Sequence, residues 1–587
     1  MNSKNIKIAV ISLLSLIVVF FVYRFFFGSA RSIYRLIPKD SYVVMNVNLK
    51  AIATKLDLTR IKNSTLYAKY KEETSRGEKD FLQVIFDSVL HDPKKSGIDF
   101  GTEASIYGFE KGHGRYFAVA VAIDSKSKFD KLIDENLTKE NKQYAKGDIN
   151  IIEIDDRVLL GYDGDHAILL NTEQYDNVRE KSVEKTLLYL FDLHRDENFN
   201  KNIASSKFAS TKGDITWFVD MQHLIGDEMP KKSEGRKYFD FSLLSSLNFN
   251  QDNFELNTDF VFETEDVLKD VKSIITKHGI SREQLPFLSN GKILGLLSLS
   301  FDFKQFIEVF GEKYEKELGR KLSKEQGGMT LEDYKNLYTG DVNVSLLDVK
   351  AIMEDYDKYE LDEATKEYKM VKAQRPKFLP IFSATMGIKD KAVLKKVFKT
   401  VIERNAGSTE EFGRYLELNN SYIGSLYYVV SGNYITLIND SALAYKIKNE
   451  GKLGESPDAM KAMVCENAFS FFLDLDLKNY PEGLKSTYFE NYYMKEVSAP
   501  FFANINSISI TGNDQHGQLK INLVPGNDNS LVRLFNAFDA QVKNELEREQ
   551  LRSQEREQEQ SLLDSLNKLA APEDEVRDET PAYSPQH

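Results

Sequence analysis

The sequence predicts an α+β protein made of two diverged copies of a mixed, mainly antiparallel sheet-plus-helix unit. One transmembrane helix precedes the copies, and a charged helix and a disordered tail follow them. Three observations lead to this prediction: an apolar run of bilayer length near the N-terminus, blocks of sequence that recur in the same order, and alternating strands that run directly into amphipathic helices.

The apolar run near the N-terminus extends from Ile8 to Phe27. A helix over these residues would be about 30 Å long at about 1.5 Å per residue, which matches the hydrocarbon core of a bilayer. We therefore expect residues 1–30 to hold the chain in a membrane. A second interpretation is a signal peptide cleaved near Ala30, because small residues there resemble a signal-peptidase site.

The long domain that follows the apolar run predicts on which side of the membrane most of the protein lies. Lysines and arginines lie on both sides of the apolar run, so charge does not orient it. A long domain can be translocated regardless of such charges. We expect a protein of the bacterial inner membrane with its body in the periplasm, or, if the segment is cleaved, a protein secreted to the periplasm.

Four blocks of sequence recur in the same order. The clearest is a strand that turns into a helix, at Phe117–Ile133 and again at Phe382–Phe398. The next is a β-hairpin, with Gly164 at the turn of the first copy and Gly432 at the turn of the second. A single strand, and then a strand followed by a helix, complete each copy. This order predicts an internal duplication.

The recurrence also predicts the domain boundaries. The first α+β repeat covers residues 37–279 and the second covers residues 288–541. Residues 542–570 are expected to form a charged C-terminal helix, because residues 543–560 are almost wholly charged and amide-rich, which is typical of a solvated helix or of one half of a coiled coil. Residues 571–587 have the composition of a disordered tail.

Short polar side chains recur at predicted strand ends, each between two apolar residues. They are Asn48, Asp220, Asp302 and Asp348. Such side chains accept hydrogen bonds from backbone N–H groups, so we expect them to cap the next helix or close a turn.

Composition excludes several classes of protein. The net charge is −13, from 77 lysines and arginines against 90 aspartates and glutamates, and this argues against a broad nucleic-acid surface. The single cysteine, Cys465, excludes an intramolecular disulfide and a cysteine-based metal cage. We expect no nucleic acid among the partners.

No catalytic motif is found, so we assign no catalytic residue, no cofactor and no metal, and the sequence leans away from an enzyme. The acidic cluster from Asp155 to His166 has metal-ligand residue types, but the matching turn of the second copy is Ser431-Gly432-Asn433, without a carboxylate. We interpret the cluster as an acidic hairpin turn. The Ser-x-x-Lys spacing at Ser125 is replaced by Asp390 and Val393 in the second copy.

A segment rich in aromatic residues is present only in the second copy, at Tyr488–Phe502. Two interpretations are open, a buried part of the core or an exposed patch for a ligand or partner. The candidate patch residues are Tyr488, Phe489, Tyr492 and Tyr493.

Three stretches of sequence carry a resemblance to a known family: IPKDSYVVMNVNLKAIATKL from Ile37, DPKKSGIDF from Asp92 and FAVAVAIDSKSKFDKLI from Phe117. The chain resembles an uncharacterised domain-of-unknown-function family of duplicated Bacteroidetes cell-envelope proteins. Many members are similar to lipoproteins, whereas this chain has no acceptor cysteine directly after its apolar run. The resemblance implies an envelope location and a duplicated architecture over most of residues 37–525, and it implies no activity.

Three functions follow as hypotheses. The first is a non-enzymatic, membrane-anchored extracytoplasmic scaffold or interaction protein, bound to the membrane through its N-terminal helix and to envelope proteins through its C-terminal helix. The second is a binding module for an apolar or glycan ligand, held in a cleft between the two copies or at the aromatic segment Tyr488–Phe502, and the sequence does not specify which ligand. The third is an enzyme of unrecognised type. Fold class alone does not choose among them.

Overall fold

The computed structural model describes residues 33–570 except for a set of internal stretches. These stretches are 57, 76–80, 113, 138–140, 156, 173–179, 195, 203, 227–238, 276–277, 312–329, 362–365, 396–414, 421–423 and 485–503. The predicted anchor over Ile8–Phe27, the aromatic segment from residue 488 to 502 and the predicted tail from residue 571 lie outside the described residues.

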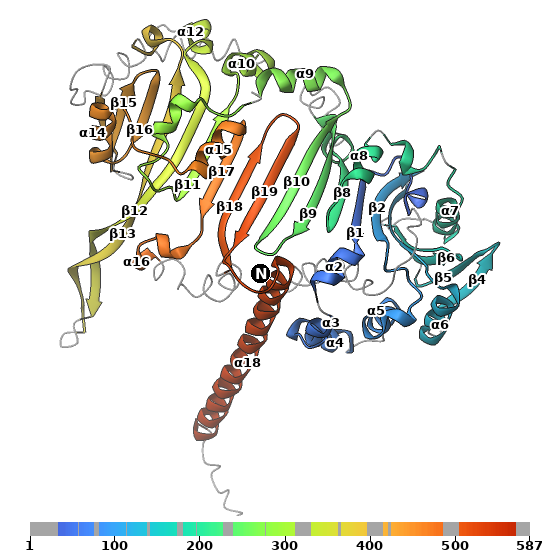
Figure 1. Cartoon of the computed structure of the whole chain (residues 1–587). Helices are drawn as coiled ribbons and strands as arrows, with labels where there is room; N and C mark the ends of the chain where they lie inside the picture. The colour runs from blue at the N-terminus through green and yellow to red at the C-terminus, as the bar shows by residue number, and fades with distance from the viewer. Residues whose placement is uncertain are drawn as a thin grey trace, which may run out of the picture.

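One antiparallel sheet runs through the described part of the molecule and carries helices on its faces (Figure 1). The sheet contains 19 described strands. In chain order they are β1 (Val43–Asn48), β2 (Glu103–Lys111), β3 (Gly114–Ala122), β4 (Lys142–Lys146), β5 (Ile149–Glu153), β6 (Val158–Tyr162), β7 (His166–Thr172), β8 (Ile215–Asp220), β9 (Phe241–Phe249), β10 (Asn253–Phe262), β11 (Gly295–Ser300), β12 (Tyr338–Leu361), β13 (Tyr368–Ile388), β14 (Tyr415–Asn420), β15 (Gly424–Ser431), β16 (Tyr434–Ile438), β17 (Phe469–Asp474), β18 (Ile505–Gly512) and β19 (His516–Leu523).

The strand order runs outward in the same way on both sides of a central pair, β10 and β19. On one side the order is β10, β9, β8, β1, β2, β3, β7, β6, β5 and β4. On the other side it is β19, β18, β17, β11, β12, β13, β16, β15 and β14. Each strand of the second half therefore has a counterpart in the first.

The predicted correspondence is confirmed at the level of topology for the strand of the strand-helix block and for the hairpin, whereas residues 396–398 of the second block lie outside the described residues. Gly164 lies in the turn between β6 and β7, and Gly432 lies in the turn between β15 and β16. Gly432 has a φ of 57°, which a glycine adopts without strain. The expectation of a mixed sheet is wrong for the described strands, because each of their pairings is antiparallel.

Helices follow the strands at matching positions. The described helices are α2 (Leu49–Lys55), α3 (Leu58–Lys62), α4 (Thr65–Ser75), α5 (Phe81–His91), α6 (Lys126–Asn136), α7 (Glu180–Phe191), α8 (Ser205–Ser210), α9 (Glu265–Ile274), α10 (Phe303–Gly311), α12 (Leu331–Lys335), α14 (Ser441–Glu450), α15 (Asp458–Glu466), α16 (Glu482–Leu484) and α18 (Ser530–Ala570). Shorter helical segments are η1 (Ile33–Leu36), η2 (Pro93–Lys95), η3 (Phe199–Lys201), η4 (Gln222–Gly226), η6 (Arg282–Phe287) and η7 (Leu477–Asn479).

Polar residues at three strand ends act as predicted, and the fourth does not. The Asn48 side chain accepts a hydrogen bond from the Ala51 amide, and Asp302 accepts one from the Gln305 amide. Asp220 accepts from the amide of His223 in the segment after β8. Asp348 instead lies inside β12, just after a register shift at residues 346–348, and its carboxylate contacts Lys292. A β-bulge places this residue within the long strand.

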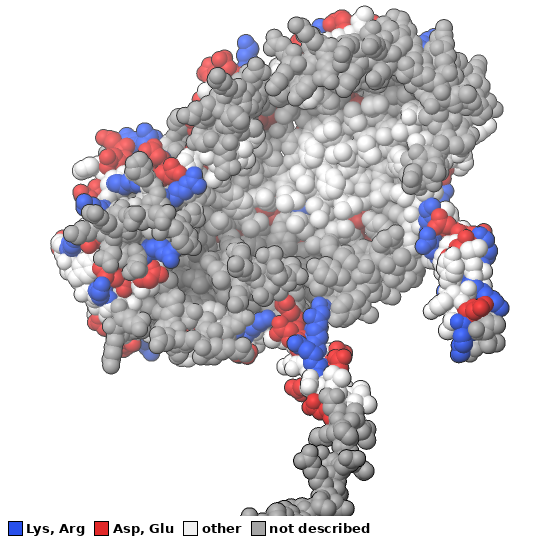
Figure 2. Space-filling view, turned by 180° about the vertical axis from the view of Figure 1, so that it is seen from behind, with Lys and Arg blue, Asp and Glu red and all other residues white. Residues whose placement is uncertain are grey.

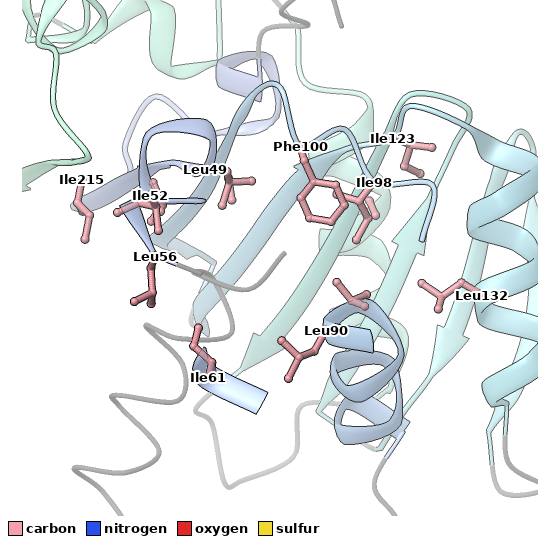
Figure 3. Packing of buried hydrophobic residues seen from close by; sticks show 14 of the residues in the cluster. Leu49, Ile52, Leu56, Ile61, Leu90, Ile98, Phe100, Ile123, Leu132 and Ile215 are labelled. Carbon is pink, nitrogen blue, oxygen red and sulfur yellow. The ribbon is translucent and has the colours of Figure 1, made fainter. Parts of the chain in front are cut away.

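Both faces of the first half are covered, because strand residues alternate between two cores. In β1, Val47 belongs to a core shared with α2, α5, α6 and α18, and Val44 belongs to a second core with η1, η3, α7 and α8. Figure 3 shows the first core, with Leu49 and Ile52 of α2 lying near Ile215 of β8. Alternation with period 2 explains why one strand supplies both cores.

The closing helices of the two halves are exchanged. α18 follows β19 of the second half, yet Leu531, Val532 and Phe535 are buried in the core of the first half. Asn529, just before α18, donates a hydrogen bond to the carbonyl of Lys55 at the end of α2. In the matching position α9 follows β10 of the first half and contacts α10 of the second. The two halves therefore contact one another through these helices as well as through the pairing of β10 with β19.

The segment after β19 is one helix rather than two. The sequence predicts a boundary between residues 541 and 542, but α18 continues without a break from Ser530 to Ala570. Its first part is buried, and from residue 551 to 566 its side chains are exposed. Among the described residues we find no helix with both the length and the hydropathy needed to cross a membrane.

An ion-pair cluster lies at one end of the central strand pair, β10 and β19. Asp259 of β10 faces His516 of β19, with 2.7 Å between Oδ1 and Nδ1, and Lys207 lies 3.2 Å from its other oxygen. Burial raises the pKa of Asp259, but hydrogen bonds from His516 and Lys207 outweigh this effect, and the pKa lies below its ordinary value.

This cluster predicts an acid-dependent contribution to stability. A lowered pKa stabilises the fold above the unfolded-state value of about 3.9, and the contribution is lost as pH falls through the folded-state value. We expect the wild type to be more stable than the Asp259→Asn variant at pH 6, with the difference shrinking below about pH 4. Urea denaturation across this range tests the prediction, and a difference that is constant with pH would contradict it.

Candidate functional site

An apolar cavity of about 480 Å³ lies between α18 and the central strands of the sheet. The strands that line it are β8, β9, β10, β18 and β19, so both halves of the chain contribute. The volume falls in the range of small-molecule sites, which is roughly 300–1,000 Å³. Lining residues include Trp217, Leu247, Leu256, Ile521, Leu534 and Phe538.

Strand register gathers these side chains on one face of the sheet. Leu256 of β10 pairs with Leu247 of β9 on one side and with Leu519 of β19 on the other. Residues directly opposite one another in antiparallel strands point to the same face. On α18, Leu534 and Phe538 are four residues apart and therefore lie on one side of the helix. The alternation of the strands and the spacing along α18 thus give the cavity one apolar wall from the sheet and one from the helix.

The lining offers binding surface and no reacting group. Only Arg533 and Asn504 are polar among the lining residues. The Arg533 side chain is 9% exposed, and its guanidinium donates to the carbonyls of Asp528 and Val524, which form the turn before α18. No carboxylate, histidine or cysteine belongs to the described lining. The cavity suits an apolar ligand.

Trp217 gives this cavity an internal reporter. It is the single tryptophan of the 587 residues, it lies in β8 and its side chain is partly buried against the first core. A ligand that enters the cavity lies against this indole or close to it. Tryptophan fluorescence therefore arises from one position, at the wall of the cavity.

A second, polar cleft of about 880 Å³ lies between α4, α5, η2 and α6. Several lysines line it, but they are engaged in other contacts. Lys62 donates to the carbonyl of His91, Lys128 donates to the carbonyl of Lys94, and Lys95 pairs with Asp92. These contacts also place the Lys128 amine on a backbone carbonyl rather than in a pair with Ser125. The cleft gives no reason to assign an anion site or a nucleophile.

The acidic hairpin turn is built by its own backbone. Asp163 Oδ1 accepts hydrogen bonds from the amides of Asp165, at 2.6 Å, and His166, at 2.7 Å. His166 is 2% exposed and its Nδ1 lies 2.9 Å from Arg35. Among the described residues, no group of three or more histidine, cysteine, aspartate or glutamate side chains is arranged to hold a metal ion. Asp163 acts as the acceptor of an Asx turn.

This geometry predicts that the carboxylate charge is dispensable. Asn keeps the accepting oxygen, so we expect the Asp163→Asn, Asp165→Asn variant to change the thermal midpoint by no more than about 2 °C. Asp163→Ala removes the acceptor and should lower stability by about 1 kcal/mol. Thermal unfolding with and without a chelator distinguishes the interpretations, since a metal site would make the double Asn variant unstable and the wild type sensitive to chelator.

The structure places few of the residues that the sequence singles out near the cavity. The patch candidates Tyr488, Phe489, Tyr492 and Tyr493 lie outside the described residues, as do the anchor residues Ile8 and Phe27. Cys465 is half-buried on α15, and burial raises the pKa of its thiol, in keeping with an unreactive apolar residue. The sequence interpretation named a cleft between the two copies as one place for a ligand, but it assigned no lining residue, although Leu531, Leu534, Phe535 and Phe538 have the apolar spacing of one helix face.

Comparisons with known proteins identify a family for this chain. Among solved structures, crystal form IV of TP0453 is similar over 39% of this chain and 81% of that chain, at 12% identity and a TM-score of 0.23. Crystal form III of TP0453 is similar over 43% and 91%, at 10% identity and a TM-score of 0.24. Scores this low do not establish a shared fold. No curated protein matches the chain. Residues 34–531 match the family described as a domain of unknown function, DUF4836, and the chain belongs to that family.

Proposed function

We propose that this chain is an envelope protein that binds an apolar, lipid-like molecule, with an acyl chain in the cavity under α18. The observation that carries the proposal is the cavity of about 480 Å³ whose lining is apolar apart from Arg533 and Asn504. Transfer of apolar ligand surface into such a lining is favourable by roughly 25 cal/mol per Å². The site supplies affinity for a hydrocarbon chain without a group to react with it.

The lining also favours one of the two ligand classes, apolar molecules and glycans, between which the sequence does not choose. A glycan presents hydroxyl groups on nearly every carbon, and burying them without hydrogen-bond partners costs several kcal/mol. The described lining has almost no donors or acceptors to offer, because the Arg533 guanidinium is already bound to carbonyl oxygens. An apolar chain fits this surface, and a sugar does not.

The cellular setting of the proposal comes from the sequence. The apolar run Ile8–Phe27 supports an anchor in the bacterial inner membrane, with the body in the periplasm. Cleavage near Ala30 would release the same body into the periplasm. The matching strand order on both sides of β10 and β19 supports descent from a duplicated unit, so the cavity is a product of joining the two copies.

A scaffold role is the second candidate function, and the exposed part of α18 favours it. Leu551, Leu562, Leu563 and Leu566 are each 49–65% exposed on a helix that projects from the body (Figure 1). Apolar side chains on a charged helix provide a surface for a partner helix. An envelope protein with a complementary helix is the partner that this surface suits.

Quenching of Trp217 fluorescence tests the binding proposal. Bromine atoms quench tryptophan only at short range, so a fatty acid brominated near the middle of its chain reports entry into the cavity. We expect saturable quenching by the brominated acid, reversed by the same acid without bromine, and no quenching by a brominated sugar. Absence of saturable quenching by any brominated single-chain lipid would overturn the proposal.

A further inference from the structure

The β12–β13 hairpin projects far beyond the sheet. β12 and β13 pair from Tyr338 with Ile388 to Leu361 with Tyr368, but β11 and β16 pair with them only near residues 341–346 and 383–387. Residues 350–378 therefore form a two-stranded ribbon without other described strands beside it. Figure 1 shows the ribbon pointing away from the body, and Figure 2 shows it standing apart from the rest of the surface.

Four large apolar side chains gather at the end of this ribbon and form the tip cluster. Tyr359 pairs with Met370, and Leu361 pairs with Tyr368, so all four point to one face. Their exposed fractions are 66%, 60%, 46% and 71%. Aromatic and methionine side chains are enriched in protein interfaces, so a tip with this composition indicates a docking surface.

Charged side chains along the ribbon are neutralised within it. Lys358 pairs with Glu360 at 2.9 Å, and Lys372 pairs with Asp357 at 2.6 Å. Nearer the body, Glu354 pairs with Lys377 at 2.9 Å and also contacts Arg375. Such a ribbon presents no net charge to a highly charged partner. The apolar tip cluster is the feature that selects an occupant.

A complementary apolar hollow lies on the sheet itself. Leu297 of β11 and Val344 of β12 are directly paired, and they are 36% and 37% exposed. Leu299 and Phe471 flank them on the same face and are half-buried. Figure 2 shows a hollow of almost uncharged surface in the view from behind. The neighbouring residue Ser298, which points to the other face, is 1% exposed, so the exposed face is the apolar one.

The hollow arises from the asymmetry of the exchanged helices. In the first half the long helix α18 packs over the apolar face of the sheet and lines the cavity. Its counterpart α9 has 10 residues against 41 for α18. It contacts α10 and β10, and the carbonyl of Ile274 at its end accepts a hydrogen bond from the amide of Asp302, just after β11. Among the described residues the apolar face of the second half is thus left partly open.

We propose that two copies of this chain form a twofold dimer in which the tip cluster of each copy packs into the hollow of the other. In one molecule the ribbon stands apart from its own hollow, so a copy cannot cover itself with its own tip (Figure 2). A lipid surface is flat and fits the tip but not the concave hollow. A second copy is the occupant that covers both features, and a twofold interface uses each of them twice.

The area is consistent with this arrangement. The four exposed side chains of one tip offer on the order of 400 Å², given about 150–250 Å² for a large aromatic residue. Because the contact occurs twice, each copy contributes one tip and one hollow, roughly 800 Å² per partner. Stable interfaces bury about 800 Å² per partner.

Crosslinking between two differently marked copies tests the dimer in membranes that contain the full chain. One copy carries Met370→Cys and the other carries Val344→Cys, both with Cys465→Ser and with different tags. We expect a mild oxidant to give a crosslinked product that holds both tags. The matched control is Lys369→Cys in place of Met370→Cys, because Lys369 points to the other face of the ribbon, and it should give little product. Equal yields from residues 369 and 370, or no product from Met370→Cys, would overturn the proposal.

Charge placed in the tip gives an independent test of the same interface. We expect Tyr368→Lys with Met370→Lys to convert the detergent-solubilised dimer to a monomer, with an unchanged thermal midpoint because both residues are exposed. Lys369→Glu should leave the dimer intact. A wild type that is monomeric at micromolar concentration would contradict the dimer, as would a variant that loses only its adsorption to phosphatidylcholine vesicles. Neither test uses the ligand cavity, so their failure would leave the binding proposal standing.

Discussion

Ending the chain after residue 529 is expected to unfold the first half of the molecule, although the deleted helix belongs by sequence to the second half. The deletion removes Leu531, Val532 and Phe535 from the first core, where each is less than 8% exposed. Burial of such a side chain contributes about 1.5–3 kcal/mol. The loss is therefore on the order of 5 kcal/mol, and a domain has only about 5–15 kcal/mol of stability in total.

Two matched truncations test whether the buried part of α18, rather than the length of the helix, stabilises the first half. Ending the chain after residue 550 removes only the exposed part of α18, and ending it after residue 570 removes only the predicted tail. Both should leave the thermal midpoint within about 2 °C of the full chain, because little apolar surface is lost. Hydrogen exchange of β1, β2 and β8 is the sharpest measurement. Rapid exchange confined to the second half after the cut at 529 would show that the helix exchange is wrong.

Filling the cavity is expected to remove ligand binding without weakening the fold. Ala537 lines the cavity from α18 and is 5% exposed, so Ala537→Phe places a ring where an acyl chain would lie. We expect the affinity for a brominated fatty acid, measured by quenching of Trp217, to fall by a factor of roughly ten or more. Stability should be unchanged or higher, since the added ring is apolar and enters open space.

The control for this variant is one residue away on the same helix. Asn536 is exposed, so Asn536→Phe adds the same ring outside the cavity. It should bind the brominated acid as the wild type does. Equal binding by Ala537→Phe and the wild type would show that quenching does not report an occupied cavity. Loss of binding by both variants would show a disturbance of the helix rather than competition for the space.

The hairpins and the order of the recurring blocks along the chain could be predicted from the sequence because each block carries its own local signal. A turn glycine at Gly164 or Gly432, with alternating apolar residues on either side, specifies a hairpin whatever surrounds it. The helical spacing of Leu531, Leu534 and Phe535 predicted an amphipathic helix in the same way. Local patterns of this kind are properties of short stretches of chain, and a single sequence contains them.

The residues that line the cavity and the helix exchange could not be predicted, because both depend on which elements meet. Trp217, Leu256 and Leu519 come from strands that lie far apart in the sequence, and their alternation indicates only that one face is covered. The same spacing on α18 would fit a partner in either half. At Asp348 a single extra residue in β12 moved a predicted strand end into the middle of a strand. One inserted residue reverses the faces of all that follow, and composition does not reveal it.

The position of a brominated fatty acid in a crystal of the protein is the most direct measurement of the central claim. The account predicts bromine peaks, located by anomalous scattering, inside the cavity between Trp217 and Leu534, with the carbon chain beneath α18. Peaks confined to the hollow at Leu297 and Val344, or no ordered bromine at saturating ligand, would contradict the claim that the chain binds lipid-like molecules in the space where its two halves join.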